Sequence, residues 1–384
     1  MEYALSELFT LQMGKTPSRD NSSYWKKSEN NWISIADLTN SGKYISNTKE
    51  TLSDSAVAES GIKKIPANTV IMSFKLSLGK VAITEKEMYS NEAIMAFIDK
   101  GVEKISPEYL YYLLCAKDWS KGTNKAVMGA TLNKATLSTI KIQLHEYDNQ
   151  LEIVNMLNRV SSSIDFRKQQ LTKLDEFVKA RFVEMFGDFE FNPKKFPIYL
   201  LCNLCDVGSS KRIYQEEQST SGIPFLKISD LVDLIDAGTF SASTFIPSDR
   251  YERLCSQGLT PKTNDVLITS RGTLGKCYIV KKSDEFYFQD GMISWLSNIS
   301  EKVSSTYISY LFMQPYIQKQ ILALQAGSTV AYLSISMLKR LNIILPPLSL
   351  QNQFAAFVAE VDKSKLFAEL FAQSTCILAE NRSK

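Results

Sequence analysis

The sequence predicts an α+β fold in which two α/β domains form a tandem repeat, each domain is followed by a long helix, and the two helices pair as an antiparallel coiled coil. Three observations predict it. The 384-residue chain is self-similar at a period of about 200 residues, a feature typical of duplicated architectures. Each copy contains short β-branched runs bounded by Gly, Pro and Asn. Each copy also ends in a long segment that is free of helix-breaking residues over most of its length.

The repeat is defined by segments that match in the same order in both copies. Residues 66–81 (PANTVIMSFKLSLGKV) align with residues 262–277 (KTNDVLITSRGTLGKC), and both contain a short apolar run, a basic residue, a small hydroxyl residue and then Leu-Gly-Lys. The other matching pairs are residues 32–38 with 226–231, 105–113 with 303–311, 129–132 with 327–330, and the segments that begin at Gln150 and Gln351. The β-type runs at 70–72 and 266–269 predict strands, and residues 107–116 and 306–320 predict helices.

The long segments predict two helices with apolar seams. From Gln150 to Met185 there is neither Pro nor Gly, and the seam consists of Leu157, Ile164, Leu171, Leu174 and Val178. The second helix, from Gln351 to about Asn381, has a less regular seam of Phe354, Val358, Val361 and Phe371. A helix of about 36 residues spans roughly 54 Å, which is more than a small domain needs to cover its core. Two amphipathic helices that lie on their own domains are the alternative, but a paired coiled coil explains their length better.

Composition indicates a globular protein with little net charge. The chain is 44% hydrophobic and 22% charged, with a formal net charge of +3. A nucleic-acid-binding chain with this balance needs local basic patches, or a partner that supplies most phosphate contacts. The acidic start of the sequence does not resemble a secretory signal, and no stretch approaches the roughly 18 apolar residues of a membrane span. We therefore expect a cytoplasmic protein.

The sequence lacks the residue patterns of the common catalytic and metal sites. The six cysteines are spread along the chain, and with His145 as its single histidine we expect neither a disulfide framework nor a metal site. Residues 271–276 (RGTLGK) superficially resemble a P-loop. However, the first glycine of a P-loop would fall at Ser270, and Cys277 stands where Ser or Thr should bind magnesium. The sequence predicts a non-catalytic binding module.

The duplicated unit resembles a known family. A β–basic–small–Leu-Gly-Lys loop, a Gly-small-Thr stretch and a long terminal helix, all present twice, are similar to the specificity subunit of type I restriction–modification systems. In the second copy, residues 327–329 (GST), residues 345–348 (LPPL) and Gln351 resemble the way this family begins its helix. The resemblance covers the whole chain, although the first copy has residues 143–147 (QLHEY) in place of the Pro-Pro turn.

The resemblance implies a domain organisation and a set of partners. Residues 1–147 and 188–349 would be target recognition domains, each reading one half of a split asymmetric DNA site. Residues 148–187 and 350–384 would be the central and distal spacer helices. The implied partners are double-stranded DNA, two methyltransferase (modification) subunits and, where present, restriction subunits. S-adenosylmethionine, ATP and magnesium are expected on those subunits, with no cofactor on this chain, in a bacterial or archaeal cytoplasm.

Two alternatives stay open at this point. One is a specificity subunit that serves a type IIB-like methylating and cleaving system. The other is a duplicated interaction scaffold that binds no DNA. Sequence-specific DNA binding with a methyltransferase partner separates the scaffold from the other two.

Basic and hydroxyl side chains of the repeated segments are the candidates for DNA contact. Such groups suit phosphate contacts that position a domain, while Arg271 could read guanine and Asn133 could read adenine. The competing interpretation is that the Gly-Lys turn simply joins two strands and that its lysine is solvated. The candidates are Lys75, Ser77, Lys80, Arg271, Thr273 and Lys276 in the loop, Thr131, Asn133, Lys134, Thr329 and Tyr332 in the second segment, and Lys211 and Arg212 near the start of the second domain.

Overall fold

The computed structural model describes residues 1–26, 28–75, 77–119, 124–126, 129–325 and 331–382. Within these ranges, residues 124–126, 129–131 and 368–382 are described by their backbone alone. The chain folds as two compact units: unit 1 comprises Met1–Ile164 with Thr375–Lys384, and unit 2 comprises Asp165–Ser374.

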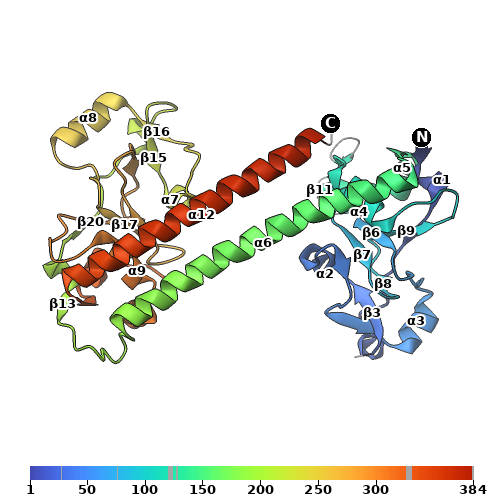
Figure 1. Cartoon of the computed structure of the whole chain (residues 1–384), viewed down its shortest axis with the longest axis horizontal. Coiled ribbons are helices and arrows are strands. Elements are labelled where there is room, and N and C mark those ends of the chain that lie inside the picture. The colour runs from blue at the N-terminus through green and yellow to red at the C-terminus, as the bar shows by residue number, and fades with distance from the viewer. Residues whose placement is uncertain (27, 76, 120–123, 127–128, 326–330, 383–384) are drawn as a thin grey trace. The chain divides into compact units, whose positions relative to one another are not determined.

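Unit 1 is a mixed α/β domain followed by the first part of a long helix (Figure 1). Its strands are β1 (Glu2–Ala4), β2 (Phe9–Met13), β3 (Asn30–Ile33), β4 (Tyr44–Ile45), β5 (Glu50–Leu52), β6 (Val70–Ser73), β7 (Val81–Thr84), β8 (Tyr89–Ser90), β9 (Ile94–Asp99), β10 (Asn124–Ala126), β11 (Gly129–Thr131) and β12 (Lys141–Gln143). Its helices are α1 (Leu5–Leu8), η1 (Ser22–Trp25), α2 (Ile35–Asn40), α3 (Asp54–Ser60), α4 (Pro107–Ala116), α5 (Lys134–Thr139) and the start of α6 (Tyr147–Phe186).

The main sheet of unit 1 is covered on both faces. Its strand order is β2-β9-β6-β7-β4, antiparallel except for the β4–β7 pair. Side chains alternate between the faces of a strand, and here Val70 and Met72 join one apolar cluster with α1, α4 and α5 while Ile71 joins another with α2. This is why the β6 segment is an uninterrupted apolar run and does not alternate with polar residues.

Unit 2 contains the end of α6, a second mixed domain and most of the last helix. Its strands are β13 (Ile198–Leu200), β14 (Asp206–Gly208), β15 (Ile223–Leu226), β16 (Phe245–Ile246), β17 (Val266–Thr269), β18 (Cys277–Ile279), β19 (Tyr287–Phe288), β20 (Ile293–Ser297) and β21 (Asn342–Ile344). Its helices are η2 (Leu201–Asn203), η3 (Gln215–Glu217), α7 (Ile228–Ala237), α8 (Ser248–Ser256), α9 (Ser305–Phe312), α10 (Pro315–Leu324), α11 (Ile335–Lys339) and α12 (Leu348–Arg382).

The topology of unit 2 repeats that of unit 1. Its main sheet has the order β14-β20-β17-β18, which corresponds to β2-β9-β6-β7. The smaller sheet β16-β15-β19 corresponds to β5-β3-β8, with one antiparallel and one parallel pair in each. The first strand of each copy pairs with the strand that precedes its long helix, as β1 with β12 and β13 with β21. The strand pairing thus supports the duplication inferred from the sequence.

One predicted helix is two. The sequence predicted a single helix over 306–320, but α9 ends at Phe312 and α10 begins at Pro315. Proline disfavours the helical conformation of the residue before it, and Gln314 is extended, with φ −79° and ψ 145°. The prediction of an uninterrupted helix was therefore wrong at Pro315.

The local sequence sets where α6 ends and where α12 begins. Helix α6 is 40 residues long and its end is followed by Gly187 at φ +83°, whose N–H donates to the Val183 carbonyl at 2.7 Å. A side chain at Gly187 would meet the Pro193 ring at 2.9 Å and would also be strained by the positive φ. Helix α12 is 35 residues long and begins directly after Pro346-Pro347.

Within unit 2, α12 runs antiparallel to the end of α6 (Figure 1). The Phe182 ring packs against Phe354 at 5.2 Å and the Phe177 ring packs against Phe357 at 5.1 Å, both measured between centroids. Further along, the Lys365 ammonium contacts the Asp175 carboxylate at 2.5 Å. Residue numbers fall on α6 as they rise on α12, which defines the antiparallel direction.

The seam residues differ in how much they are buried. Val178, Phe354, Val358 and Val361 are buried in one cluster with the core of unit 2, and Leu174 packs against that cluster. Leu157, Ile164 and Leu171 are half-buried. The Phe371 side chain lies outside the described residues. The part of the seam nearest to the second domain is thus also part of the core of that domain.

None of the helices in the described part of the chain is long and apolar enough to span a membrane.

The packing of Phe354 predicts that this side chain stabilises unit 2. Phe354 is fully buried and contacts rings of α6 and α9. Phe354→Ala should lower the unfolding free energy by about 3–5 kcal/mol, because a large buried ring is replaced by a cavity. Phe367→Ala is the matched control, since Phe367 lies on the same helix and is 70% exposed. Urea denaturation of both variants measures the difference, and equal midpoints would contradict the packing.

Candidate nucleic-acid interface

The repeated Leu-Gly-Lys loop is the same β-hairpin turn in both units. In unit 1, Ser73 exchanges backbone hydrogen bonds with Gly79 and Lys80, at 3.0 and 2.9 Å, and its hydroxyl accepts from the Lys80 N–H at 3.1 Å. In unit 2, Thr269 makes the same three contacts with Gly275 and Lys276, at 2.9, 2.9 and 3.0 Å. The hydroxyls of Ser73 and Thr269 also donate to the carbonyls of Ser77 and Thr273.

The glycine of this turn is required by the backbone. Gly79 has φ +76° and Gly275 has φ +78°, in the left-handed region that favours glycine. A side chain at Gly79 would also lie 2.7 Å from the Trp119 ring. The backbone of the hairpin thus requires the glycine. It does not require the basic residues of the loop, which are Lys75 and Lys80 in unit 1 and Arg271 and Lys276 in unit 2.

The structure brings the two candidate segments of each unit together. The Leu132 N–H donates to the Phe74 carbonyl at 3.0 Å, and the equivalent Leu333 N–H donates to the Ser270 carbonyl at 2.9 Å. The hairpin and the segment before α5 or α11 therefore lie side by side in each unit, and we call their described residues the hairpin surface of that unit. Sequence reasoning had named both segments but had no means of joining them.

Arg271 is an exposed residue of this surface in unit 2. Its backbone forms an isolated bridge with Tyr332, and its guanidinium carbon lies 5.2 Å from the centre of the Tyr332 ring. The Arg271 side chain is exposed. A guanidinium supported on an aromatic face keeps its N–H donors available in a fixed plane, which suits bidentate contact with phosphate or guanine.

The lysines of the two hairpins differ in their surroundings. Lys276 forms an ion pair with Asp236 of α7, with N–O distances of 2.5 and 2.6 Å. The equivalent Lys80 is exposed. Lys75 is half-buried, and its ammonium lies 5.3 Å from the centre of the Phe74 ring. A phosphate contact by Lys276 would have to compete with the Asp236 carboxylate.

Asn133 caps a helix. Its side-chain oxygen accepts from the Thr136 N–H at 2.7 Å at the start of α5, as the Ser334 hydroxyl accepts from the Met337 N–H at 3.2 Å at the start of α11. Adenine recognition by asparagine uses that same oxygen, so the predicted adenine contact conflicts with the cap. Lys134, the next residue, is exposed. Thr329 and the Thr131 side chain lie outside the described residues.

Lys211 and Arg212 belong to a loop that follows β14. The Lys211 N–H donates to the Tyr287 hydroxyl at 2.8 Å, and burial raises the pKa of Tyr287 to about 12. The Arg212 guanidinium pairs with Asp290 at 2.9 Å. Both basic side chains are exposed, so this loop adds positive charge close to the acidic Asp290.

Sequence reasoning missed Arg19, which occupies the corresponding loop of unit 1. Its guanidinium lies 3.6 Å from the centre of the Trp25 ring and forms two hydrogen bonds with Glu50, at 2.6 and 2.9 Å. The hydrogen bond with Arg19 lowers the pKa of Glu50. The sequence had indicated Lys15 in this loop as a weaker candidate, because it lies near the start of the domain, and Arg19 lies four residues further on.

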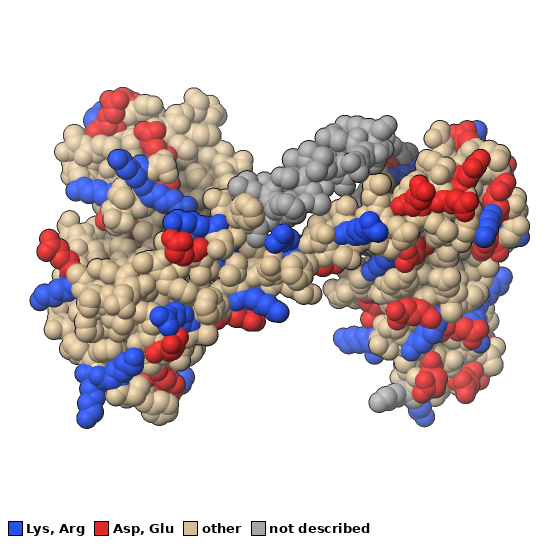
Figure 2. Space-filling model, in the orientation of Figure 1, with Lys and Arg blue, Asp and Glu red and all other residues tan. Residues whose placement is uncertain are grey.

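Charge on the visible face is mixed. Figure 2 shows basic and acidic side chains interspersed over both units, with no large region of one sign on the face shown. On the face shown, binding to a polyanion would depend on individual exposed basic side chains and not on a broad positive field.

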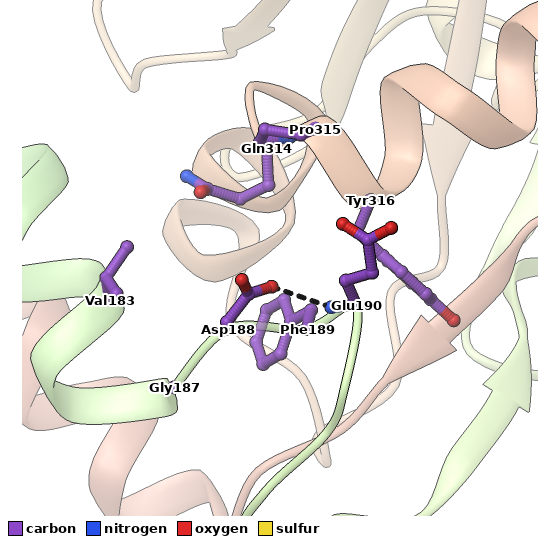
Figure 3. A pocket seen from close by; sticks show the side chains of 8 residues that line it. All are labelled: Val183, Gly187, Asp188, Phe189, Glu190, Gln314, Pro315 and Tyr316. Atoms are coloured by element: carbon purple, nitrogen blue, oxygen red, sulfur yellow. Dashed lines mark hydrogen bonds between the residues drawn. The ribbon is translucent and has the colours of Figure 1, made fainter.

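A pocket in unit 2 does not suit nucleic acid. Its lining includes Asp188 and Glu190 from the loop after α6, and Gln314, Pro315 and Tyr316 at the start of α10 (Figure 3). Asp188 accepts from the Glu190 N–H at 2.8 Å, and Glu190 pairs with Lys319 at 2.7 Å. The Asp188 carboxylate in the wall repels a phosphate, whereas the charge of Glu190 is offset by the Lys319 ammonium.

Comparison with curated proteins identifies similar chains. The chain is 24% identical over 371 residues to the type I restriction enzyme MjaIX specificity subunit of Methanocaldococcus jannaschii, covering 90% of this chain and 82% of that protein. It is 25% identical over 297 residues to a putative type I restriction enzyme specificity subunit of Haemophilus influenzae, covering 74% and 71%.

Solved structures show the same fold. The type I restriction–modification S subunit from M. genitalium matches with a TM-score of 0.56 at 13% identity, covering 99% of this chain and 94% of that one. A chain from a structure on complex assembly and conformational transition of the type I restriction–modification system matches with a TM-score of 0.58 at 15% identity, with the same coverage.

The family model for the type I restriction modification DNA specificity domain matches twice, at residues 1–176 and 193–370. Each match includes one hairpin surface and the beginning of the long helix that follows it. These matches cover most of the chain and coincide with its internal duplication. The chain therefore belongs to the type I restriction–modification DNA specificity family and carries two copies of its domain.

Proposed function

We propose that this chain is the DNA-recognition subunit of a type I restriction–modification complex, reading a bipartite asymmetric site with one domain for each half. The observation that carries the proposal is the pairing of each specificity-domain match with its own hairpin surface. Each surface joins a tight turn with basic residues beside it to a helix-capping segment, and the two surfaces differ in their exposed side chains. Two related but different reading surfaces suit two different half-sites.

The proposed partners follow from the same family membership. Methyltransferase subunits would bind the chain, and restriction subunits would join where the system has them. The chain itself would carry out no chemistry and hold no cofactor, while S-adenosylmethionine, ATP and magnesium would be bound by those subunits. The sequence supports this division, because its closest approach to a phosphate-binding motif, residues 271–276, forms a hairpin turn between two strands.

The proposal predicts the form of the DNA target. Genomic methylation should depend on this chain and should show two short specified blocks separated by unspecified base pairs, because two separate domains read it. Comparing the methylated motif in cells with and without the gene, and after its reintroduction, measures this. A single continuous or palindromic motif that depends on the chain would overturn the proposal.

A substitution tests the hairpin of unit 2. Arg271→Ala in the assembled complex should weaken DNA binding by about 1–3 kcal/mol, since a positioned phosphate or guanine contact is lost. Lys262→Ala is the matched control, because Lys262 is also exposed and lies just before the same strand, outside the hairpin surface. Binding is measured for both at the same salt concentration. Equal DNA affinities of the two variants would show that Arg271 does not contact DNA.

An insertion tests whether α6 sets the distance between half-sites. Ser161, Ser162 and Ser163 are exposed in α6, and four residues added there lengthen the helix by roughly 6 Å while nearly keeping its face. The accepted gap should grow by up to about two base pairs at roughly 3.4 Å per pair. The control is a four-residue insertion after Ser241, in the exposed connection between α7 and β16. A folded, methylating α6 variant that keeps the original gap would show that the helix is not the spacer.

A further inference from the structure

A buried glutamine occupies the fourth position of each long helix. Gln150 is the fourth residue of α6 and is 1% exposed, and Gln351 is the fourth residue of α12 and is fully buried. A glutamine amide carries two N–H donors and an acceptor oxygen. Burial of such a group costs free energy unless each polar atom finds a partner, so the partners of these amides reveal what holds them.

In unit 1, the Gln150 amide joins three segments of the chain. Its oxygen accepts from the Ser106 N–H at 3.0 Å. Its nitrogen donates to the Lys104 carbonyl at 3.2 Å and to the His145 carbonyl at 3.0 Å. The helix is thereby tied to the loop that leads into α4 and to the residues that connect it with β12.

In unit 2, Gln351 makes the same three bonds. Its oxygen accepts from the Ser304 N–H at 2.9 Å. Its nitrogen donates to the Lys302 carbonyl at 3.1 Å and to the Pro346 carbonyl at 2.7 Å. Ser304 precedes α9 as Ser106 precedes α4, and Pro346 is five residues before its glutamine as His145 is. The local sequences differ, with QLHEY in one copy and LPPL in the other, yet the pattern of hydrogen bonds made by the glutamine amide is the same.

Each helix has a second attachment further along. In unit 1, Asn158 accepts from Tyr112 at 2.7 Å and from Lys43 at 2.8 Å, and donates to Glu108 at 3.0 Å. In unit 2, Phe354 packs on Tyr310 with 5.2 Å between ring centres. Asn158 lies eight residues after Gln150, about 12 Å along the axis. Contacts at separate points along a helix together define its direction relative to the domain.

We propose that Gln150 and Gln351 are positioning residues that fix the angle at which each long helix leaves its recognition domain, and that this angle limits the gap between half-sites that the complex accepts. The inference rests on the proposed function. An apolar side chain could fill the same volume in many orientations. The amide is satisfied in one arrangement of three backbone segments, because its hydrogen bonds are directional and a lost partner leaves a buried polar group unpaired.

The test replaces both glutamines by methionine, which is similar in length and makes none of the three bonds. Complexes of the full chain with its methyltransferase subunits are given a DNA library in which the two half-sites are kept and the gap is varied by a few base pairs either way. Methylation at each gap is counted by sequencing. Gln150→Met/Gln351→Met should raise methylation at gaps one base pair longer or shorter, relative to the native gap, by about tenfold, which corresponds to about 1.4 kcal/mol of lost discrimination.

Matched controls separate positioning from general loss of stability. Gln169→Met and Gln353→Met change exposed glutamines on the same two helices and should keep the native gap distribution. A residue that only stabilises the fold would lower the melting temperature and leave the gap distribution of the folded fraction unchanged. That outcome in the Gln150→Met/Gln351→Met complex overturns the proposal.

Milder variants keep the test decisive if the methionine variants fail to fold. Ser106→Pro and Ser304→Pro remove the N–H from which each glutamine oxygen accepts, together with the serine hydroxyl, and Ser106→Ala and Ser304→Ala are the controls for the loss of the hydroxyl. The φ of −70° at Ser106 is within the range of proline, and the φ of −84° at Ser304 lies a few degrees beyond it. The proline variants should broaden the gap distribution in the same direction. A wild-type complex that methylates no bipartite site would overturn the proposed function itself. A narrow range of accepted gaps in the wild-type complex that all variants preserve would overturn only the positioning role of Gln150 and Gln351.

Discussion

The packing of Phe354 between α6 and the second domain is the contact on which unit 2 depends. Its ring lies 5.2 Å from Phe182, 5.5 Å from Phe186 and 5.2 Å from Tyr310. One apolar cluster therefore contains residues of the central helix, the distal helix and the domain between them in sequence. Because these elements share a core, the helix pair is an extension of the domain and not a separate stalk.

Duplication explains how two different surfaces arise on one framework. The hairpin bonds of Ser73 are repeated at Thr269, and the bonds of Gln150 are repeated at Gln351. These shared contacts are made by backbone groups, or by side chains that bond to backbone. The differences lie in the side chains that flank the turn, with half-buried Lys75 in one copy where exposed Arg271 stands in the other. The framework can thus stay constant while the chemistry presented to DNA changes.

The electrostatics of the chain fit a subunit that works inside a complex. Several of its basic side chains are already paired, as Arg19 is with Glu50, Arg212 with Asp290 and Lys276 with Asp236. Such pairs fix side-chain geometry but reduce the net field, and exposed pairs of this kind add little stability. Tight binding to a polyanion from a chain of net charge +3 would need local basic patches or phosphate contacts from another chain.

The sequence by itself determined the duplication, the strands at 70–72 and 266–269 and the two long helices, and it offered the hairpin turn as one of two interpretations of the Leu-Gly-Lys loop. These follow from local rules: apolar runs, glycine at positive φ, and the absence of Pro and Gly from Gln150 to Met185. The tertiary structure decided which segments meet. It joined Phe74 with Leu132 and Ser270 with Leu333, and set Arg271 on the Tyr332 ring. It also placed Asn133 at the N-terminus of α5 as a cap, and it paired Lys276 with Asp236, 40 positions away in the sequence. Contacts between residues so far apart in sequence depend on how the domain closes, and residue periodicity carries no information about that closure.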